Sequence, residues 1–532
     1  MKKLLLLILL LTAAVIFGAC GDDDDGADGT FYTVIPNNPQ NLDPQLAEDS
    51  ESLSVIRNIF EGLTEISENG DIVCAAAESY AVSEDMLTYT FRLREGMTWS
   101  GAEGFSAEVT AHDYVYAFRR IFDPGIHSPY TEDFAALKNS AAVYDGVMSY
   151  TDLGVRAIDE YTVQFELDYP VTDFLYLLST GAASPCCEEF YLSTGGRYGL
   201  SAEYTAGNGA FTLTEWNYDP YWNENFLTLK RNPDNSTEER RTYPLYVNYI
   251  ITDSAEEYEK TSGNTVDVMY CEAENLPKLR GKKAGEYPVY AVGVTFNMKD
   301  DIFSNENIRK ALGITADPSV YEGKTSSGIA WGRGVLPPAV TVMGQSVRDL
   351  LGDFAEAKSG GAELWSNGIA ETGGNYPELA VIIVPESFAD APIVYMLTDS
   401  WNEELGFSCG VEILSDEEYA QRIAEGNYTT ALSVMTCDSA CAADFFEGFE
   451  GYISDPADLE EYRSIIASQR HSASANAALR YCKEAEILLT ENGYYIPVFY
   501  ESKFLVTGNN VSDVIYEPFS GTIDFRPAKK YS

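Results

Sequence analysis

Residues 87–96 read LTYTFRLREG, and residues 110–120, a little further along the chain, read TAHDYVYAFRR. In the first stretch every second residue is apolar, namely Leu87, Tyr89, Phe91 and Leu93. This alternation is the period of a half-buried strand. The second stretch favours a helix over 111–121, with Asp113 near its start and Asp123-Pro124 closing it. A strand followed directly by a helix indicates a chain of mixed α/β class.

The same two periods recur on both sides of this stretch. Strands are predicted at 30–35, 161–167, 210–215, 227–230, 377–384 and 431–435, and helices at 50–61, 307–313 and 473–491. Turns are predicted at Asn208-Gly209 and at 232–235. Gly352 to Tyr376 is polar and Gly-rich, which predicts a surface excursion. Because 532 residues are too many for one core, we expect an α/β protein with two lobes or more.

The first thirty residues are typical of an exported protein. Lys2 and Lys3 precede an apolar stretch, 4–17, that is too short to span a bilayer comfortably, so residues 1–19 are predicted to be a signal peptide and not a membrane anchor helix. Phe17-Gly18-Ala19-Cys20 resembles a bacterial lipobox, which would place lipids on Cys20; ordinary cleavage nearby is the alternative. Residues 20–29 contain four consecutive aspartates and would form a flexible acidic tether.

Composition limits the function classes further. The formal charge of −48 argues against binding to nucleic acid or to anionic lipid. No P-loop, dinucleotide-binding motif or G-x-S-x-G elbow is found, and neither an enzyme nor a cofactor is expected. The three histidines are far apart, which argues against a zinc site. Nine cysteines leave disulfide pairing open, with isolated buried thiols the simpler interpretation.

Several runs, taken in order, resemble the family 5 extracellular solute-binding proteins, the class that contains the oligopeptide- and dipeptide-binding proteins. Besides the two stretches quoted first and Trp99-Ser100, these are Asn41-Leu42-Asp43-Pro44, Ile59-Phe60-Glu61-Gly62-Leu63, Ala77-Glu78-Ser79-Tyr80, Asn208-Gly209-Ala210-Phe211 with Glu215-Trp216, and Ile308-Arg309-Lys310-Ala311-Leu312. Asp123-Pro124 with Ser128-Pro129-Tyr130, and Asp152 to Asp159, favour the oligopeptide type. The resemblance covers nearly all of residues 30–532.

The resemblance implies a periplasmic-binding-protein-like, two-lobed α/β fold with an extra inserted domain and a ligand cleft between the lobes. Domain I is expected to be discontinuous, over 30–67, 179–285 and 498–532. Domain II is expected over 68–178, inserted into domain I. Domain III, over 286–497, would form the opposite lobe.

The resemblance also implies a set of ligand-binding residues. The family binds the peptide's α-ammonium with an aspartate, and Asp438 matches it, with Met435 and Ser439 where the family has aromatics. Thr436 would contribute backbone groups, as would Glu48 and Ser50. The remaining matched positions are Val434, Tyr130, Tyr270, Tyr419 and Tyr500. The alternatives are a solvated loop acid for Asp438 and core residues for the tyrosines.

What the resemblance implies about function is a lipid-anchored, monomeric binding protein at the outer face of the bacterial cytoplasmic membrane or in the periplasm. It would bind a peptide and deliver it to the permease and ATPase subunits of an ABC importer. Three other classes stay open: a surface peptide sensor or chaperone, a binding protein for a non-peptide solute, and a hydrolase on this scaffold.

Overall fold

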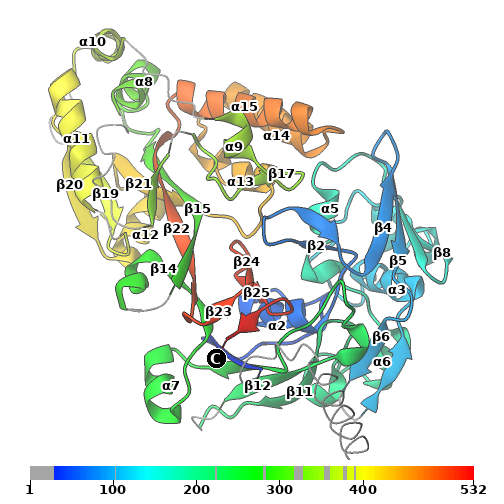
Figure 1. The fold of residues 1–532 in the computed structure, drawn as a ribbon. Coiled ribbons are helices and arrows are strands. Elements are labelled where there is room, and N and C mark those ends of the chain that lie inside the picture. The colour runs from blue at the N-terminus through cyan, green and yellow to red at the C-terminus, as the bar shows by residue number, and fades with distance from the viewer. Residues whose placement is uncertain are drawn as a thin grey trace, which may run out of the picture.

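The computed structural model describes residues 29–101, 104–221, 225–278, 283–316, 328–332, 334–352, 360–375, 380–388 and 391–531. The predicted signal peptide, Cys20 and all of the acidic tether except Gly29 lie outside these ranges. The described elements form two lobes joined by a pair of long strands (Figure 1). Within the described ranges we find no helix with the length and apolarity that a membrane span requires.

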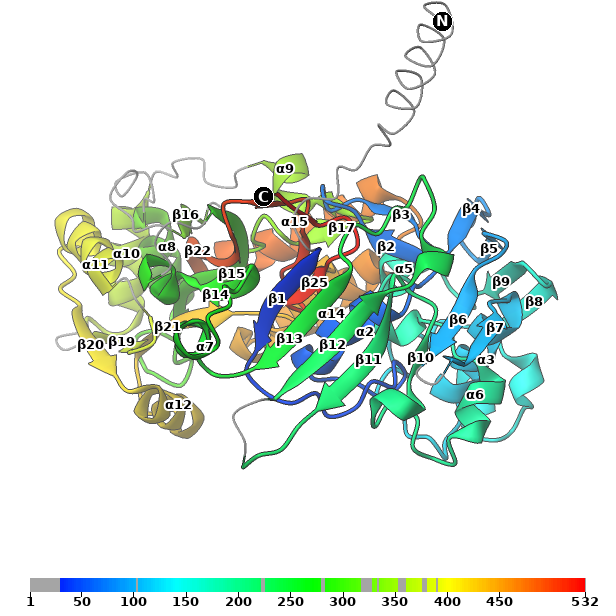
Figure 2. The same cartoon turned by 60° about the horizontal axis from the view of Figure 1, so that its bottom comes forward.

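One large sheet runs through both lobes. Its strands are, in spatial order, β11 (Phe211–Asn217), β12 (Phe226–Arg231), β13 (Tyr246–Ile251), β1 (Thr30–Ile35), β14 (Val268–Glu272), β22 (Ile496–Thr507), β15 (Lys283–Phe296), β21 (Thr430–Met435), β19 (Val381–Pro385) and β20 (Gly410–Leu414), with β16 (Ile329–Trp331) added to β22. The first four lie side by side at one end (Figure 2). The antiparallel pair β15 and β22 runs from one lobe into the other (Figure 1), so this pair forms the hinge.

The first lobe contains a second sheet. Its order is β4 (Ala77–Val82), β5 (Thr88–Leu93), β9 (Thr162–Glu166) and β8 (Val155–Asp159). In β5 the side chains alternate between buried and half-buried, as the sequence predicts. Helix α3 (Ala111–Ile121) packs on this sheet and begins with a capping box, in which the backbone N–H of Thr110 donates to Asp113 at 2.8 Å.

Shorter elements complete this lobe. Its other helices are α2 (Ser50–Ile59), α4 (Ser140–Tyr144), α5 (Phe174–Leu177), α6 (Glu188–Ser193) and α7 (Ala255–Ser262), and its short strands include β2 (Thr64–Ile66), β3 (Ile72–Cys74), β6 (Thr98–Gly101), β7 (Ser106–Glu108), β10 (Ala206–Gly207), β24 (Ile515–Glu517) and β25 (Thr522–Asp524). Helix α2 is attached to β25 near the end of the chain. The amide of Asn58 donates to the carbonyl of Ile523 at 2.7 Å, and its oxygen accepts from the N–H of Phe525 at 2.9 Å.

The second lobe packs its helices around β19, β20 and β21. These helices are α8 (Glu306–Thr315), α9 (Val347–Leu351), α10 (Gly361–Glu371), α11 (Ala391–Leu405), α12 (Asp416–Glu425), α13 (Ala442–Glu447), α14 (Pro456–Arg470) and α15 (Ala475–Glu491). Helices α8, α10 and α11 gather on one side and α13 to α15 on the other (Figure 1).

The predicted surface excursion at Gly352 to Tyr376 is wrong in its described part. Helix α10 lies there and packs against α8, with Trp365 only 6% exposed and 5.0 Å from the ring of Phe407. Two of the glycines, Gly361 and Gly368, misled the prediction, because they lie on the face of α10 that packs closely against α8 and do not mark a loop. A Cβ at Gly368 would lie 2.6 Å from a side-chain carbon of Ile308 on α8.

The other predicted elements are confirmed. The strands at 30–35, 87–93, 161–167, 210–215, 227–230 and 431–435 and the helices at 50–61, 111–121, 307–313 and 473–491 agree with the structure to within two residues at each end. The strand predicted at 377–384 is β19, which ends one residue later; 377–379 lie outside the described ranges.

The sequence runs that carry the resemblance join segments that are distant in the chain. Arg120 of α3 is 2% exposed and donates to both carboxylate oxygens of Asp43, at 2.5 and 3.0 Å, while Gln45 accepts from it at 2.5 Å. The guanidinium also lies over the ring of Tyr191, 4.1 Å from its centroid. The buried pair therefore fixes the loop before α2 against helix α3 and the four-stranded sheet on which α3 packs.

A second joint explains the Asn208-Gly209 run. The Asn208 side chain accepts from the N–H of Glu61 and donates to its carbonyl, both at 2.9 Å. A Cβ at Gly207 would lie 1.8 Å from the carbonyl oxygen of Ile59, so only glycine fits beside the end of α2.

Candidate functional site

The end of β21 presents an open backbone edge. Its ladder with β15 continues to Met435, whereas its ladder with β19 joins only Thr430 and Ala431. Within the described chain, the backbone from Ser433 to Met435 therefore has a strand partner on one side only. The side chains of Val434, Thr436 and Asp438 are exposed, and Val434 is 40% exposed. This segment can accept a further extended chain along its edge.

The segment before α2 carries the second group of predicted residues. Glu48 and Ser50 are exposed on it, and the hydroxyl of Tyr130 donates to the carbonyl of Ala47 directly behind them. Burial and the neighbouring Glu48 carboxylate raise the pKa of Tyr130. Tyr130 thus supports the segment that displays Glu48 and Ser50.

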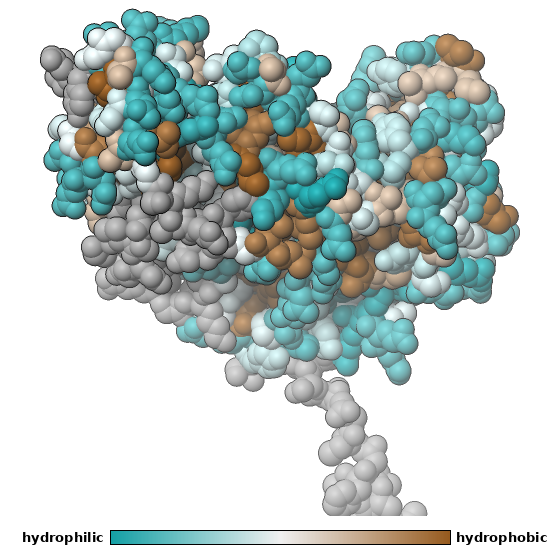
Figure 3. All heavy atoms as spheres, turned by 90° about the horizontal axis from the view of Figure 1, so that it is seen from above, coloured by the Kyte–Doolittle hydropathy of each residue, from teal (hydrophilic) through white to brown (hydrophobic). Residues whose placement is uncertain are grey.

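Tyr270 on β14 lies next to this segment. Burial together with the Glu51 carboxylate raises the pKa of Tyr270, and Ser50 lies close enough to act against this shift. The structure therefore brings Glu48, Ser50, Tyr130 and Tyr270 together on the first lobe, and Val434, Thr436 and Asp438 on the second. The molecular surface is indented between the two lobes (Figure 3).

Tyr419 and Tyr500 are placed differently. The hydroxyl of Tyr419 donates to the carbonyl of Leu432 at 2.8 Å, and burial raises the pKa of Tyr419 to about 12. Tyr500 is 2% exposed in the core of the second lobe and donates to the carbonyl of Gly334 at 3.0 Å. Tyr419 therefore supports β21 from α12, and Tyr500 has the environment of a core residue.

The hinge strands add residues that the sequence did not single out. Because directly opposed residues share one face of a sheet, the register places Glu272 of β14, Lys503 of β22 and Tyr287 of β15 in one row. Tyr290 donates to Glu272 at 3.0 Å, and the ammonium of Lys503 lies 5.5 Å from the Tyr290 ring centroid. One signal in the sequence could have found Glu272. It lies two residues after Tyr270, and residues two apart in a strand point to the same face of the sheet.

The lobes also meet at a seam away from the hinge. Here hydrogen bonds join residues 172–176, in and just before α5, to the second lobe. The N–H of Thr172 donates to the carbonyl of Arg470 at 2.8 Å, and the N–H of Met343 donates to Asp173 at 2.6 Å. The N–H of Ala440 donates to the hydroxyl of Tyr176 at 3.2 Å. Burial raises the pKa of Asp173 to about 7. The hydrogen bond from Met343 lowers this pKa, and the negative charge of the Asp444 carboxylate raises it further.

Replacing Asp173 by asparagine should stabilise the protein at high pH. Because the folded-state pKa is raised, the wild type loses stability as the pH rises from about 4, the unfolded value, through about 7. Asparagine can still accept from Met343 but never ionises. We expect the free energy of unfolding at pH 8 to rise by roughly 1–3 kcal/mol, with little change at pH 4. Urea unfolding at both pH values measures this.

The matched control is Asp159→Asn, since Asp159 is exposed and its pKa is lowered, chiefly by the hydrogen bond from the N–H of Tyr161. This variant should not show the gain in stability at pH 8 that is expected of Asp173→Asn. A pH dependence of Asp173→Asn equal to that of the wild type would contradict the prediction.

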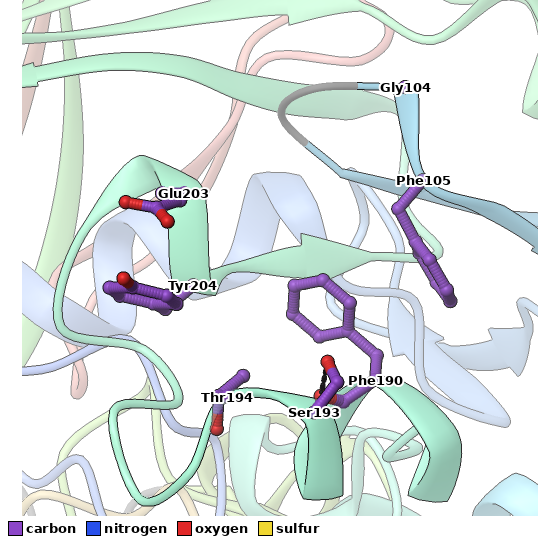
Figure 4. Close-up of a pocket in the computed structure, with 7 residues that line it drawn as sticks. All are labelled: Gly104, Phe105, Phe190, Ser193, Thr194, Glu203 and Tyr204. Atoms are coloured by element: carbon purple, nitrogen blue, oxygen red, sulfur yellow. Dashed lines mark hydrogen bonds between the residues drawn. The ribbon is translucent and has the colours of Figure 1, made fainter.

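A separate pocket of about 400 Å³ opens on the first lobe, away from these residues. It is lined by Gly104, Phe105, Phe190, Ser193, Thr194, Glu203 and Tyr204 (Figure 4). The rings of Phe105 and Phe190 lie 4.8 Å apart, while Ser193 and Thr194 bond to carbonyls of α6. None of the residues expected to bind ligand lines this pocket.

The described residues do not suggest metal or disulfide chemistry. Within them no three histidine, cysteine or acidic side chains are arranged to hold a metal ion. All eight of their cysteines are free thiols, and burial raises the pKa of both Cys437 and Cys441 beside Asp438.

Comparisons with known proteins agree with this architecture. Residues 71–452 match the family model described as bacterial extracellular solute-binding proteins, family 5. The dipeptide-binding protein DppE of Bacillus subtilis is 25% identical over 523 residues, covering 94% of this chain and 91% of the relative. The oligopeptide-binding protein OppA of the same organism is 24% identical over 514 residues, covering 93% and 91%.

Solved structures share the fold. The unliganded open form of the periplasmic murein tripeptide-binding protein MppA superposes with a TM-score of 0.71 at 21% identity, over 95% of this chain and 98% of that one. OppA of Listeria monocytogenes bound to peptide superposes with a TM-score of 0.60 at 20% identity, over 95% and 100%.

Proposed function

The chain belongs to the bacterial extracellular solute-binding proteins of family 5, and from this membership we propose that it binds a short peptide between its lobes and delivers it to an ABC importer. The relatives named as dipeptide- and oligopeptide-binding proteins support a peptide as the ligand class. The permease and ATPase subunits of the importer would be its partners, and the binding protein itself would carry out no catalysis.

The observation that carries the proposal is the open edge of β21 with Asp438 beyond it. A peptide has backbone donors and acceptors that must all be paired when water is excluded. The edge from Ser433 to Met435 can pair them as an added strand, whatever the side chains are. The carboxylate of Asp438 would then receive the α-ammonium, and Glu48 to Ser50 would contact the peptide from the first lobe.

The proposed domain boundaries follow the same scheme. Domain I comprises 30–67, 179–285 and 498–532, domain II comprises 68–178, and domain III comprises 286–497. The four-stranded sheet with β5 falls within domain II, and β19 to β21 fall within domain III, which supports these limits.

Peptide binding should close the lobes about the hinge. Closure brings the edge of β21 and the segment at Glu48 onto the same ligand, so the molecule becomes more compact. We expect titration of the mature protein with a mixture of tri- to pentapeptides to release or absorb heat, and small-angle scattering to give a smaller radius of gyration once the protein is saturated.

Free amino acids at the same concentration are the control, since they lack the backbone that an added strand requires. Saturating binding with an unchanged radius of gyration would contradict closure. Absence of binding by all of the peptides, tested after unfolding and refolding to remove bound ligand, would contradict the proposed function.

The finer proposal is that Cys20 carries the lipid anchor at the outer face of the cytoplasmic membrane. Only the acylated sulfur and amine would hold this acidic body to the bilayer. Cys20→Ala should therefore lose labelling by a radioactive fatty acid and leave the protein unprocessed or released. Cys74→Ala, which removes a thiol within the folded body, should keep the label. Equal labelling of Cys20→Ala and wild type would contradict lipidation at this residue.

A further inference from the structure

Helix α5 lies at the boundary between the lobes, and its side chains enter two different cores (Figure 1). Phe174 and Leu178 are buried in the core of the first lobe. They are four residues apart and therefore lie on one face of the helix. Tyr176, midway between them, is buried in the core of the second lobe, with 7% of its surface exposed. Its ring thus joins the first lobe to the second.

Tyr176 holds the loop that follows β21. Its hydroxyl accepts from the N–H of Ala440 at 3.2 Å. The carbonyl of Ala440 accepts from the N–H of Thr341 at 2.8 Å, and Thr341 begins β17 (Thr341–Val342). Ala440 is 7% exposed, so its two backbone polar groups depend on these partners. Ala440 is therefore a fixed point of this loop.

Asp173, directly before α5, holds the hairpin to which Thr341 belongs. Strand β17 pairs with β18 (Gln345–Ser346), and Met343 in the turn between them has a left-handed backbone, with a φ of 51°. This conformation is unfavourable for a residue with a side chain. The N–H of Met343 donates to the Asp173 carboxylate at 2.6 Å, which stabilises the turn. The first lobe therefore holds Ala440 directly through Tyr176 and indirectly through this hairpin.

Asp438 lies between two fixed points of the same loop. Met435, before it, ends the ladder of β21 with β15, and Ala440 follows it by two residues. Two residues of chain span at most about 7 Å, so the backbone of Asp438 cannot move far from Ala440. The place of its carboxylate is therefore set by what holds Ala440.

We propose that Tyr176 and Asp173 are positioning residues for the ammonium site, because from the first lobe they hold Ala440 so that Asp438 meets the α-ammonium of the bound peptide. The inference rests on the proposed function and adds to it two residues that act through the loop. Separating Tyr176 from Ala440 would uncover a buried ring and leave a buried N–H without a partner. We therefore expect this contact to persist when the lobes close.

The test compares free tetra-alanine with N-acetylated tetra-alanine in calorimetric titrations of the refolded, ligand-free protein. The ratio of their dissociation constants reports how well the protein recognises the ammonium. Tyr176→Phe keeps the ring and removes only the hydroxyl. We expect it to lower this ratio at least about tenfold by weakening the free peptide, while the acetylated peptide binds within about twofold of its affinity for the wild type.

Two changes at Asp173 test the indirect contact. Asp173→Ala removes the acceptor for the N–H of Met343 and should lower the ratio as Tyr176→Phe does. Asp173→Asn keeps an acceptor at the same place and should keep the ratio of the wild type.

Tyr494→Phe is the matched control for the loss of a buried hydroxyl. Tyr494 is 2% exposed in the same core, and its hydroxyl donates to Asp458 of α14 at 2.7 Å. This variant also loses a hydrogen bond from the second lobe, but not one that holds the loop after β21. It should therefore keep the ratio of the wild type.

A wild-type ratio in both Tyr176→Phe and Asp173→Ala would overturn this inference and leave peptide binding intact. If Asp173→Ala does not fold, Tyr176→Phe decides alone. A ratio that falls equally in Tyr494→Phe would also overturn it, because loss of any buried hydroxyl bond would then suffice. If the wild type binds both peptides equally, the ammonium site fails and this inference with it, and if it binds no peptide the proposed function itself fails.

Discussion

Replacing Asp438 by alanine should weaken the binding of an unmodified peptide by about 25- to 4,000-fold. If its carboxylate receives the peptide's α-ammonium, closure of the lobes removes water from both charges. Truncating one partner of such a pair leaves the other charge buried and unpaired, which costs roughly 2–5 kcal/mol. Each 1.4 kcal/mol corresponds to about tenfold in affinity.

The peptide offers the complementary change. N-acetylation removes the α-ammonium, so acetylated peptide should bind the wild type about as weakly as free peptide binds Asp438→Ala. The two changes should not add, because both delete the same interaction. Calorimetric titration of the four combinations measures the coupling. Glu460→Ala, which removes an exposed acid from α14, is the control for overall charge.

Equal binding of free and acetylated peptide by the wild type would show that Asp438 does not receive the ammonium. The same result would remove the most specific support for a peptide whose N-terminus is fixed at this end of β21.

The second large effect concerns stability. Arg120→Ala should lower the free energy of unfolding by roughly 3–5 kcal/mol, because it leaves Asp43 buried without its cation. Arg120 and Asp43 are 2% and 3% exposed, and the loss also removes the contact of the guanidinium with Tyr191. Urea unfolding followed by tryptophan fluorescence measures it.

Arg480→Ala is the matched control. Arg480 is 61% exposed and pairs with Glu484 one turn along α15, at 3.5 Å. Such exposed pairs contribute about 0.3–0.5 kcal/mol, so this variant should unfold nearly as the wild type does. An Arg120→Ala protein as stable as Arg480→Ala would mean that Asp43 finds another partner or becomes protonated without cost.

Much of the fold was predictable because its signals are local. The alternation in β5 and the capping box of α3 lie within a few residues of sequence, and both are confirmed. Helix α10 was missed because two of its glycines pack against α8, which lies about 50 residues earlier in the chain. Local composition does not reveal a packing partner at that distance. The open edge of β21 was also unpredictable, since it depends on where the ladder with β19 ends.

Some residues of the candidate site could likewise be predicted from the sequence, and others could not. Tyr130, Tyr270 and Asp438 could be identified from sequence runs, although their roles remain predictions. Tyr419 and Tyr500 looked equivalent to them in sequence, and only the structure shows that Tyr419 supports β21 from α12 and that Tyr500 lies in the core of the second lobe.

The attachment of α2 to β25 has a consequence for biosynthesis. Asn58 and its partner Ile523 are 465 residues apart, and a ribosome adds roughly 5–20 residues per second. Helix α2 therefore exists for roughly 20–90 s before the strand that covers it has been made. Throughout that interval the side chain of Asn58, which is 1% exposed in the finished protein, lacks the Ile523 carbonyl and the Phe525 N–H to which it bonds. Nascent chains of this protein should therefore be clients of a chaperone that holds them unfolded until the last strands emerge.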